Sequence, residues 1–104
     1  MRFLRDYQGT SFRLTDERLV HILEHPEMGG LEAFIEETLA RPEYVVQSLS
    51  DSQVRLYYRF YEATRVSAKF LCVAVKADAS NPFVVTAYLT DKVKKGDIVW
   101  PAKS

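Results

Sequence analysis

The chain has 104 residues, of which 47% are hydrophobic and 12% aromatic, so it is long enough for one compact domain and too apolar to be disordered. Its 14 basic and 14 acidic residues cancel, which argues against a protein that coats nucleic acid through bulk positive charge. No apolar run approaches the roughly 20 residues that cross a bilayer, and the N-terminus lacks the apolar stretch of a secretory signal. We therefore expect one domain over residues 1–104 and no membrane partner.

Charge is unevenly distributed along this neutral chain. Residues 1–14 carry a net charge of +2, residues 15–44 one of −6, and residues 45–104 one of +4. The neutral total therefore hides an acidic middle and a basic remainder. This division could be an ordinary variation of surface charge or the mark of a basic binding surface.

Cys72 is the only cysteine. An internal disulfide and a cysteine-based zinc cluster are therefore excluded, and a cytoplasmic location is the default expectation. The thiol stands between Leu71 and Val73, so we expect a small core residue rather than a nucleophile. The four glycines form no phosphate-binding loop, and the sequence indicates no cofactor and no metal.

Residues 1–14 are predicted to form a short strand or an irregular hairpin. Side chains alternate in character from Phe3 to Tyr7, as they do in extended chains. Gly9-Thr10 then provides a turn before a second extended stretch.

Two helices are predicted between residues 15 and 40. Thr15 should cap the first, over 16–25, because a hydroxyl there precedes acidic residues in the first turn. Pro26 and the Gly29-Gly30 pair interrupt the pattern before the second helix, over 31–40. Helical spacing predicts the buried residues, which are Leu19, Ile22 and Leu23 in the first helix and Leu31, Phe34, Ile35, Thr38 and Leu39 in the second.

From residue 43 to residue 100 the pattern period falls to two, which is typical of strands. The predicted strands are 44–49, 54–62, 69–77 and 83–89, separated by turns at 50–52, 64–65 and 78–82. Links this short favour an antiparallel meander. We therefore predict an α+β fold with the two N-terminal helices on one face of a four-stranded antiparallel sheet, and a fifth strand if residues 98–100 join it.

The strand at 54–62 has two distinct faces. Its even positions are apolar and include Leu56, Tyr58 and Phe60, so we expect the helices to cover them. The odd positions, which would stay free, are Arg55, Tyr57, Arg59 and Tyr61. Arginine pairs with phosphate and tyrosine stacks on bases, so this face is predicted to bind single-stranded RNA, with an ordinary solvated face as the alternative.

Other candidate site residues lie on neighbouring elements. Thr86 and Tyr88 place two hydroxyls on one strand face, where they could bind a phosphate or be plain surface residues. Lys69 adds positive charge to the adjacent strand. His21 and His25 share one helix face. They could move protons near neutral pH or be surface residues, and a zinc site would need a third ligand.

Several blocks of this sequence match a known pattern: LTDER at 14–18, HI at 21–22, HPEM at 25–28, LYYRFY at 56–61, KFLCV at 69–73, VVTAY at 84–88 and KGD at 95–97. Over roughly residues 10–100 they resemble the PBECR family of phage- and bacterium-associated nuclease-like proteins, named for barnase, EndoU, colicin and RelE. The resemblance implies a helix-plus-antiparallel-sheet domain that cleaves RNA without a metal.

In the scheme that this resemblance implies, the RNA 2′-hydroxyl attacks the adjacent phosphate. Histidine moves protons, basic residues steady the phosphate, and late-strand hydroxyls assist. The positions that match are His21 or His25 for proton transfer, Arg59 and Lys69 for phosphate, and Thr86 and Tyr88 for the hydroxyls. Glu24 departs from the basic residue expected before His25 and would repel phosphate.

We therefore predict a metal-independent, toxin-like ribonuclease in which His21 lies with Arg59, Lys69, Thr86 and Tyr88 in one cleft, while Arg55 and Tyr57 also bind substrate. The alternatives are a non-catalytic RNA- or protein-binding module of the same fold and a protein that dimerises through the sheet. RNA is the expected partner, and a toxin-like domain could also bind a cognate antitoxin or immunity protein. The oligomeric state is not indicated.

Overall fold

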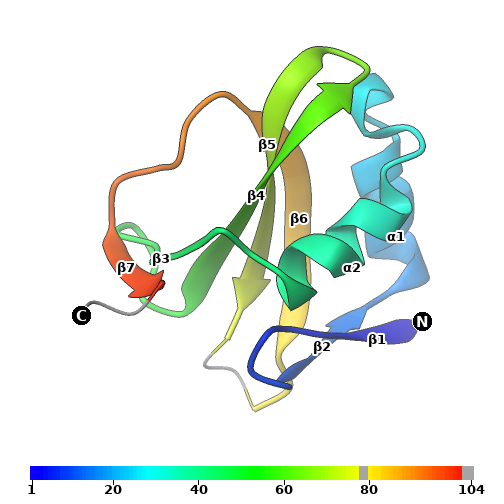
Figure 1. The fold of residues 1–104 in the computed structure, drawn as a ribbon. Coiled ribbons are helices and arrows are strands. Elements are labelled where there is room, and N and C mark those ends of the chain that lie inside the picture. Colours follow the sequence, from blue (N-terminus) through cyan, green and yellow to red (C-terminus); the bar gives the residue numbers. More distant parts are fainter. Residues whose placement is uncertain (78–79, 102–104) are drawn as a thin grey trace.

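The computed structural model describes residues 1–77 and 80–101, so the predicted turn at 78–82 lies partly outside it (Figure 1). Within these residues, seven strands form one sheet in the order β1-β2-β6-β5-β4-β3-β7. The helical elements are α1 (Asp16–Leu23), the 3-10 helix η1 (Pro26–Met28) and α2 (Glu32–Ala40). The strands are β1 (Arg2–Arg5), β2 (Ser11–Leu14), β3 (Tyr44–Gln47), β4 (Val54–Thr64), β5 (Ser67–Lys76), β6 (Phe83–Thr90) and β7 (Asp97–Trp100).

The fold is mixed α+β with two α-helices in the described part of the chain, but the prediction of a four- or five-stranded sheet is wrong. Residues 1–14 form the hairpin β1–β2, and β2 joins the sheet through a parallel pairing of Arg13 with Phe83 on β6. At the other edge, β7 pairs with β3. Both additions depend on partners far away in the sequence, and local periodicity cannot reveal such partners.

The four central strands form the predicted antiparallel meander, from β3 through β4 and β5 to β6. The whole sheet curls into a half-barrel (Figure 1). Its two edges approach each other where Tyr7, in the β1–β2 turn, meets Trp100 on β7 with ring centroids 5.0 Å apart. The half-barrel therefore encloses the core that it shares with the helices.

The helices begin and end for local reasons. The Thr15 side chain accepts a hydrogen bond from the Arg18 backbone N–H at 3.1 Å, which confirms the predicted cap. The α1 helix ends at Leu23, two residues before the predicted end, because Pro26 starts the 3-10 turn of η1. No helix in residues 1–77 and 80–101 is long and apolar enough to span a bilayer.

The predicted orientation of β4 is wrong. Tyr57 is 0% exposed and belongs to the core that the helices cover, whereas Phe60 is 40% exposed. The even-numbered Leu56 and Tyr58 belong to a second, smaller cluster on the opposite side of the sheet. We call the side that the helices cover the helix face and the opposite side the open face.

Candidate functional site

The sheet separates the predicted site residues into two groups. Residues paired across neighbouring strands point to the same face. Thr86 pairs with Ala74 and Tyr88 pairs with Cys72, which places both hydroxyls on the open face. The remaining predicted residues of the sheet, Arg55, Tyr57, Arg59 and Lys69, lie on the helix face. The predicted single cleft is therefore not formed.

Tyr57 is a structural residue of the helix face. Its hydroxyl donates a 2.6 Å hydrogen bond to Oδ2 of Asp6, which is itself buried. Asp6 Oδ1 also accepts hydrogen bonds from the backbone N–H groups of Gln8 and Thr10, both at 2.9 Å. Burial and the Asp6 carboxylate raise the pKa of Tyr57. This contact fixes the β1–β2 turn to the core and leaves Tyr57 unable to contact a ligand.

Two of the cations predicted to bind phosphate, Arg59 on β4 and Lys69 on β5, have protein partners, whereas the Nε of Arg55 is buried without a hydrogen-bond partner among the described residues. Arg59 donates a 2.8 Å hydrogen bond to the Arg41 carbonyl, and its Nε lies 3.5 Å from the Glu37 carboxylate. Lys69 forms an ion pair with Asp91. Because these charges are neutralised within the protein, they contribute little to an anion site.

The two histidines lie on the helix side of the sheet. His21 is 61% exposed, and its Nδ1 lies 3.7 Å from the carboxylate of Glu24. A pocket at this helix is lined by His21, Thr15, Glu17 and Arg18. His25 is exposed at the start of η1. Among the described residues no three histidine, cysteine or acidic side chains cluster as a metal site would require.

The open face carries an arrangement that the sequence analysis did not identify. Strand pairing aligns Phe3, Arg13, Phe83 and Lys76 in one row across β1, β2, β6 and β5. Arg5 lies on the same face, two residues from Phe3. The Arg13 guanidinium carbon is 5.9 Å from the centroid of the Phe83 ring. We call Phe3, Arg5, Arg13 and Phe83 the arginine patch.

Among the described residues, the charges of the arginine patch have no counter-ions. Across residues 1–77 and 80–101, neither Arg5 nor Arg13 forms an ion pair. The Arg13 Nε is buried without a hydrogen-bond partner in this part of the structure. Phe3 is 58% exposed beside them. The patch therefore combines two available guanidinium groups with an accessible aromatic ring.

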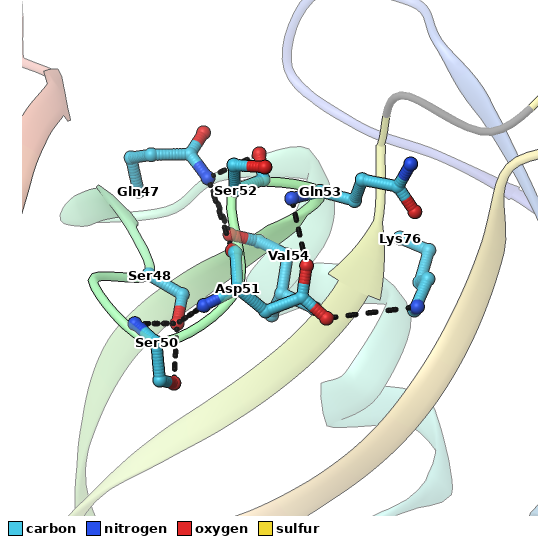
Figure 2. Close-up of polar contacts among 8 residues, drawn as sticks. All are labelled: Gln47, Ser48, Ser50, Asp51, Ser52, Gln53, Val54 and Lys76. Carbon is cyan, nitrogen blue, oxygen red and sulfur yellow. Dashed lines mark hydrogen bonds and ion pairs between the residues drawn. The ribbon is translucent and has the colours of Figure 1, made fainter.

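Lys76, the next basic residue in this row, is partly neutralised. Figure 2 shows its Nζ pointing at Asp51, with 3.6 Å between Nζ and Oδ2. Asp51 is held in the β3–β4 turn, where its Oδ1 accepts a 2.9 Å hydrogen bond from the Gln53 N–H and its own N–H donates to the Ser48 hydroxyl. Lys76 is therefore less available to an anion than Arg5 and Arg13 are.

The centre of the open face contains a cluster of Tyr58, Cys72 and Tyr88. The backbone N–H of Lys94, in the segment 91–96 between β6 and β7, donates a 3.1 Å hydrogen bond to the Tyr58 hydroxyl. Burial raises the pKa of Tyr58 to about 12 and also raises the pKa values of Cys72 and Tyr88. These groups therefore stay protonated at neutral pH and supply no base.

One signal in the sequence could have indicated the arginine patch. Phe3 and Arg5 alternate with buried residues, as Arg13 does between Phe12 and Leu14. Only the pairing of β2 with β6 shows that these residues share a face with Phe83, Thr86 and Tyr88.

We compared the chain with protein-family models, with curated proteins and with solved structures, and found no match.

Proposed function

We propose that this protein binds single-stranded RNA through the open face and does not cleave it. The observation that carries the proposal is the arginine patch, in which Arg5 and Arg13 have no counter-ion within residues 1–77 and 80–101 and Phe3 is exposed beside them. Guanidinium groups bind phosphate through paired, charge-assisted hydrogen bonds. An exposed ring accepts an unpaired base by stacking. The arginines can therefore bind the phosphate of a nucleotide, and the Phe3 ring can stack on its base.

A single strand fits this surface better than a duplex does. The bases of a duplex are stacked inside it, so the Phe3 ring would have nothing to stack on. Thr86 lies on the same face, farther along β6 than Phe83. Its hydroxyl can donate to or accept from a ribose 2′-hydroxyl, which favours RNA over DNA.

The placement of the acid-base groups supports binding without cleavage. Cleavage without a metal needs a group that titrates near neutral pH close to the bound phosphate. His21 lies on the helix side and beside Glu24, and the open-face tyrosines have raised pKa values. The predicted kinship with the PBECR family would then account for the fold and for RNA as the ligand.

The cytoplasm is the proposed location. The lone Cys72 is buried and reduced, as is usual for proteins of reducing compartments. Most acidic residues of the range 15–44 belong to α1, η1 and α2, which lie together on one side of the sheet (Figure 1), so the basic patch can attract RNA although the chain is neutral as a whole.

Fluorescence anisotropy with a labelled, unstructured ten-nucleotide RNA tests this proposal. The double variant Arg5→Gln/Arg13→Gln should bind about tenfold more weakly at low salt and reduce the log–log salt slope by about 1.4, since each phosphate contact contributes roughly 0.7. The control Arg18→Gln/Arg41→Gln removes the same charge from the helix side and should change affinity less than twofold.

Equal effects of the two double variants, or no binding by the wild type at low salt, would contradict the proposal. A parallel incubation with the same RNA in EDTA should leave the RNA intact. Cleavage that disappears in His21→Ala would instead establish the metal-independent ribonuclease predicted from the sequence.

A further inference from the structure

We infer that the RNA site extends along β6, from the arginine patch to the lysines of the 91–96 segment. Its ligand is then an extended single strand rather than a mononucleotide or a short oligonucleotide. This inference rests on the proposed function. It adds a second cationic end to the site and a minimum length for the ligand.

The first step is the row of side chains along β6. Phe83, Thr86 and Tyr88 follow one another on the open face and pair with Lys76, Ala74 and Cys72 of β5. Thr90 ends the strand and pairs with Phe70. All four β6 side chains are half-buried, so they are accessible to a ligand. At about 3.3 Å per residue, Phe83 and Thr90 are separated by roughly 23 Å.

The second step is the path of the 91–96 segment. In the sheet order, β5, β4 and β3 separate β6 from β7. The connection must therefore cross about 19 Å of sheet at the usual strand spacing. It crosses on the open face, where Val93 packs on the smaller core cluster and the Lys94 N–H binds the Tyr58 hydroxyl. Figure 1 shows this segment crossing on the side away from the helices.

The segment is also anchored at its far end. A side chain at Gly96 would collide with the Gln47 carbonyl and with the Val46 side chain. The close approach that glycine allows presses the chain onto β3. With anchors at Val93, Lys94 and Gly96, the lysines of this segment are held in place rather than carried on a free loop.

The third step is the charge on this segment. Lys92 and Lys94 are exposed, and within the described ranges neither forms an ion pair. The backbone N–H of Lys94 donates to the hydroxyl of Tyr58, which pairs with Cys72 on β5. Cys72 pairs with Tyr88. Lys94 therefore lies over the middle of the open face, whereas Lys92 stands at the end of the β6 row opposite to the arginine patch, where its N–H donates to the Thr90 hydroxyl at 3.4 Å.

The geometry sets the length of the ligand. A stacked strand rises about 3.4 Å per nucleotide, so roughly seven stacked nucleotides span the 23 Å between the two cationic ends, and a more extended strand needs fewer. An RNA of three nucleotides can reach only one end. Hydroxyl groups line the interval between the ends, which suits hydrogen bonding to riboses rather than base-specific contact.

A length series of oligouridines from two to ten nucleotides, measured by competition against the labelled ten-nucleotide RNA, tests this inference. Wild-type affinity should rise with length and reach a plateau at about seven or eight nucleotides. Lys92→Gln/Lys94→Gln should weaken the ten-nucleotide RNA about fivefold and the trimer less than twofold. Arg18→Gln/Arg41→Gln serves as the charge-matched control and should leave both unchanged.

Two results would overturn the inference. One is an affinity that does not depend on RNA length, and the other is an equal weakening of the trimer and the ten-nucleotide RNA by Lys92→Gln/Lys94→Gln. In both cases the proposed function would stand if Arg5→Gln/Arg13→Gln still weakened binding. Failure of the wild type to bind any of these RNAs would refute the proposed function itself. The two failures are therefore distinguishable.

Discussion

The two faces of the sheet use similar residue types in different ways. On the helix face, Tyr57 and Arg59 have protein partners, namely Asp6 for Tyr57 and Glu37 with the Arg41 carbonyl for Arg59. On the open face, Arg5 and Arg13 have no counter-ion among the described residues. Arginine and aromatic residues therefore do not by themselves mark a binding surface. Arg5 and Arg13 differ because they lie beside the exposed ring of Phe3, which is 58% exposed.

The largest difference between the faces should be in stability. Tyr57→Ala removes a fully buried ring from the helix-side core and should lower the free energy of unfolding by about 3–5 kcal/mol. Phe60→Ala removes a ring that is 40% exposed and should cost less than about 1 kcal/mol. Chemical denaturation measures both values. Similar losses for the two variants would mean that the faces of β4 are not as described.

A smaller effect is expected from the Tyr57 hydroxyl alone. Tyr57→Phe leaves Oδ2 of the buried Asp6 without its donor and should cost about 1–3 kcal/mol at pH 7. Tyr44→Phe, on an exposed tyrosine, is the control and should cost less than about 0.5 kcal/mol. Equal losses for the two variants would show that the Asp6 contact does not stabilise the fold.

The same hydroxyl should make stability depend on alkaline pH. The pKa of Tyr57 is raised in the folded state, so the unfolded chain loses this proton first as the pH rises. The stabilisation of the folded state that arises from this raised pKa is fully present below the ordinary tyrosine pKa of about 10 and is lost as the pH rises above it. The decline in unfolding free energy between pH 9 and 11 should be shallower in Tyr57→Phe than in the wild type. An identical decline would contradict this assignment.

The smallest effect is expected at His21. Because its side chain is exposed on the helix side, His21→Ala should change stability by less than about 0.5 kcal/mol and RNA affinity by less than twofold. Anisotropy and denaturation of one preparation give both values. A tenfold loss of affinity would place the ligand on α1 and remove the distinction between the faces.

Local patterns predicted the elements of this fold well and their arrangement poorly. The Thr15 cap and the buried stripe of α2, with Ile35, Thr38 and Leu39, follow from spacing within one helix. The orientation of β4 does not, because its neighbours Tyr57 and Tyr58 are both fully buried on opposite faces. A strand that is apolar on both sides carries no periodic signal of which side meets the helices.

The candidate site was harder to predict than the fold. Arg59 and Tyr57 looked like ligand-binding residues because their partners, Arg41 and Asp6, are distant in the sequence. Arg13 looked ordinary because its row is completed by Phe83, seventy residues later. Whether a polar side chain is available depends on contacts between distant segments, which one sequence does not display.

The most direct test of the open-face account is an amide chemical-shift titration of the labelled protein with the ten-nucleotide RNA. The account predicts saturable shifts for Phe3, Arg13, Thr86 and Lys92, and none beyond the background for Arg18, Ile35 and Arg41. It would be contradicted by shifts concentrated on α1 and α2, or by the absence of any shift at low salt.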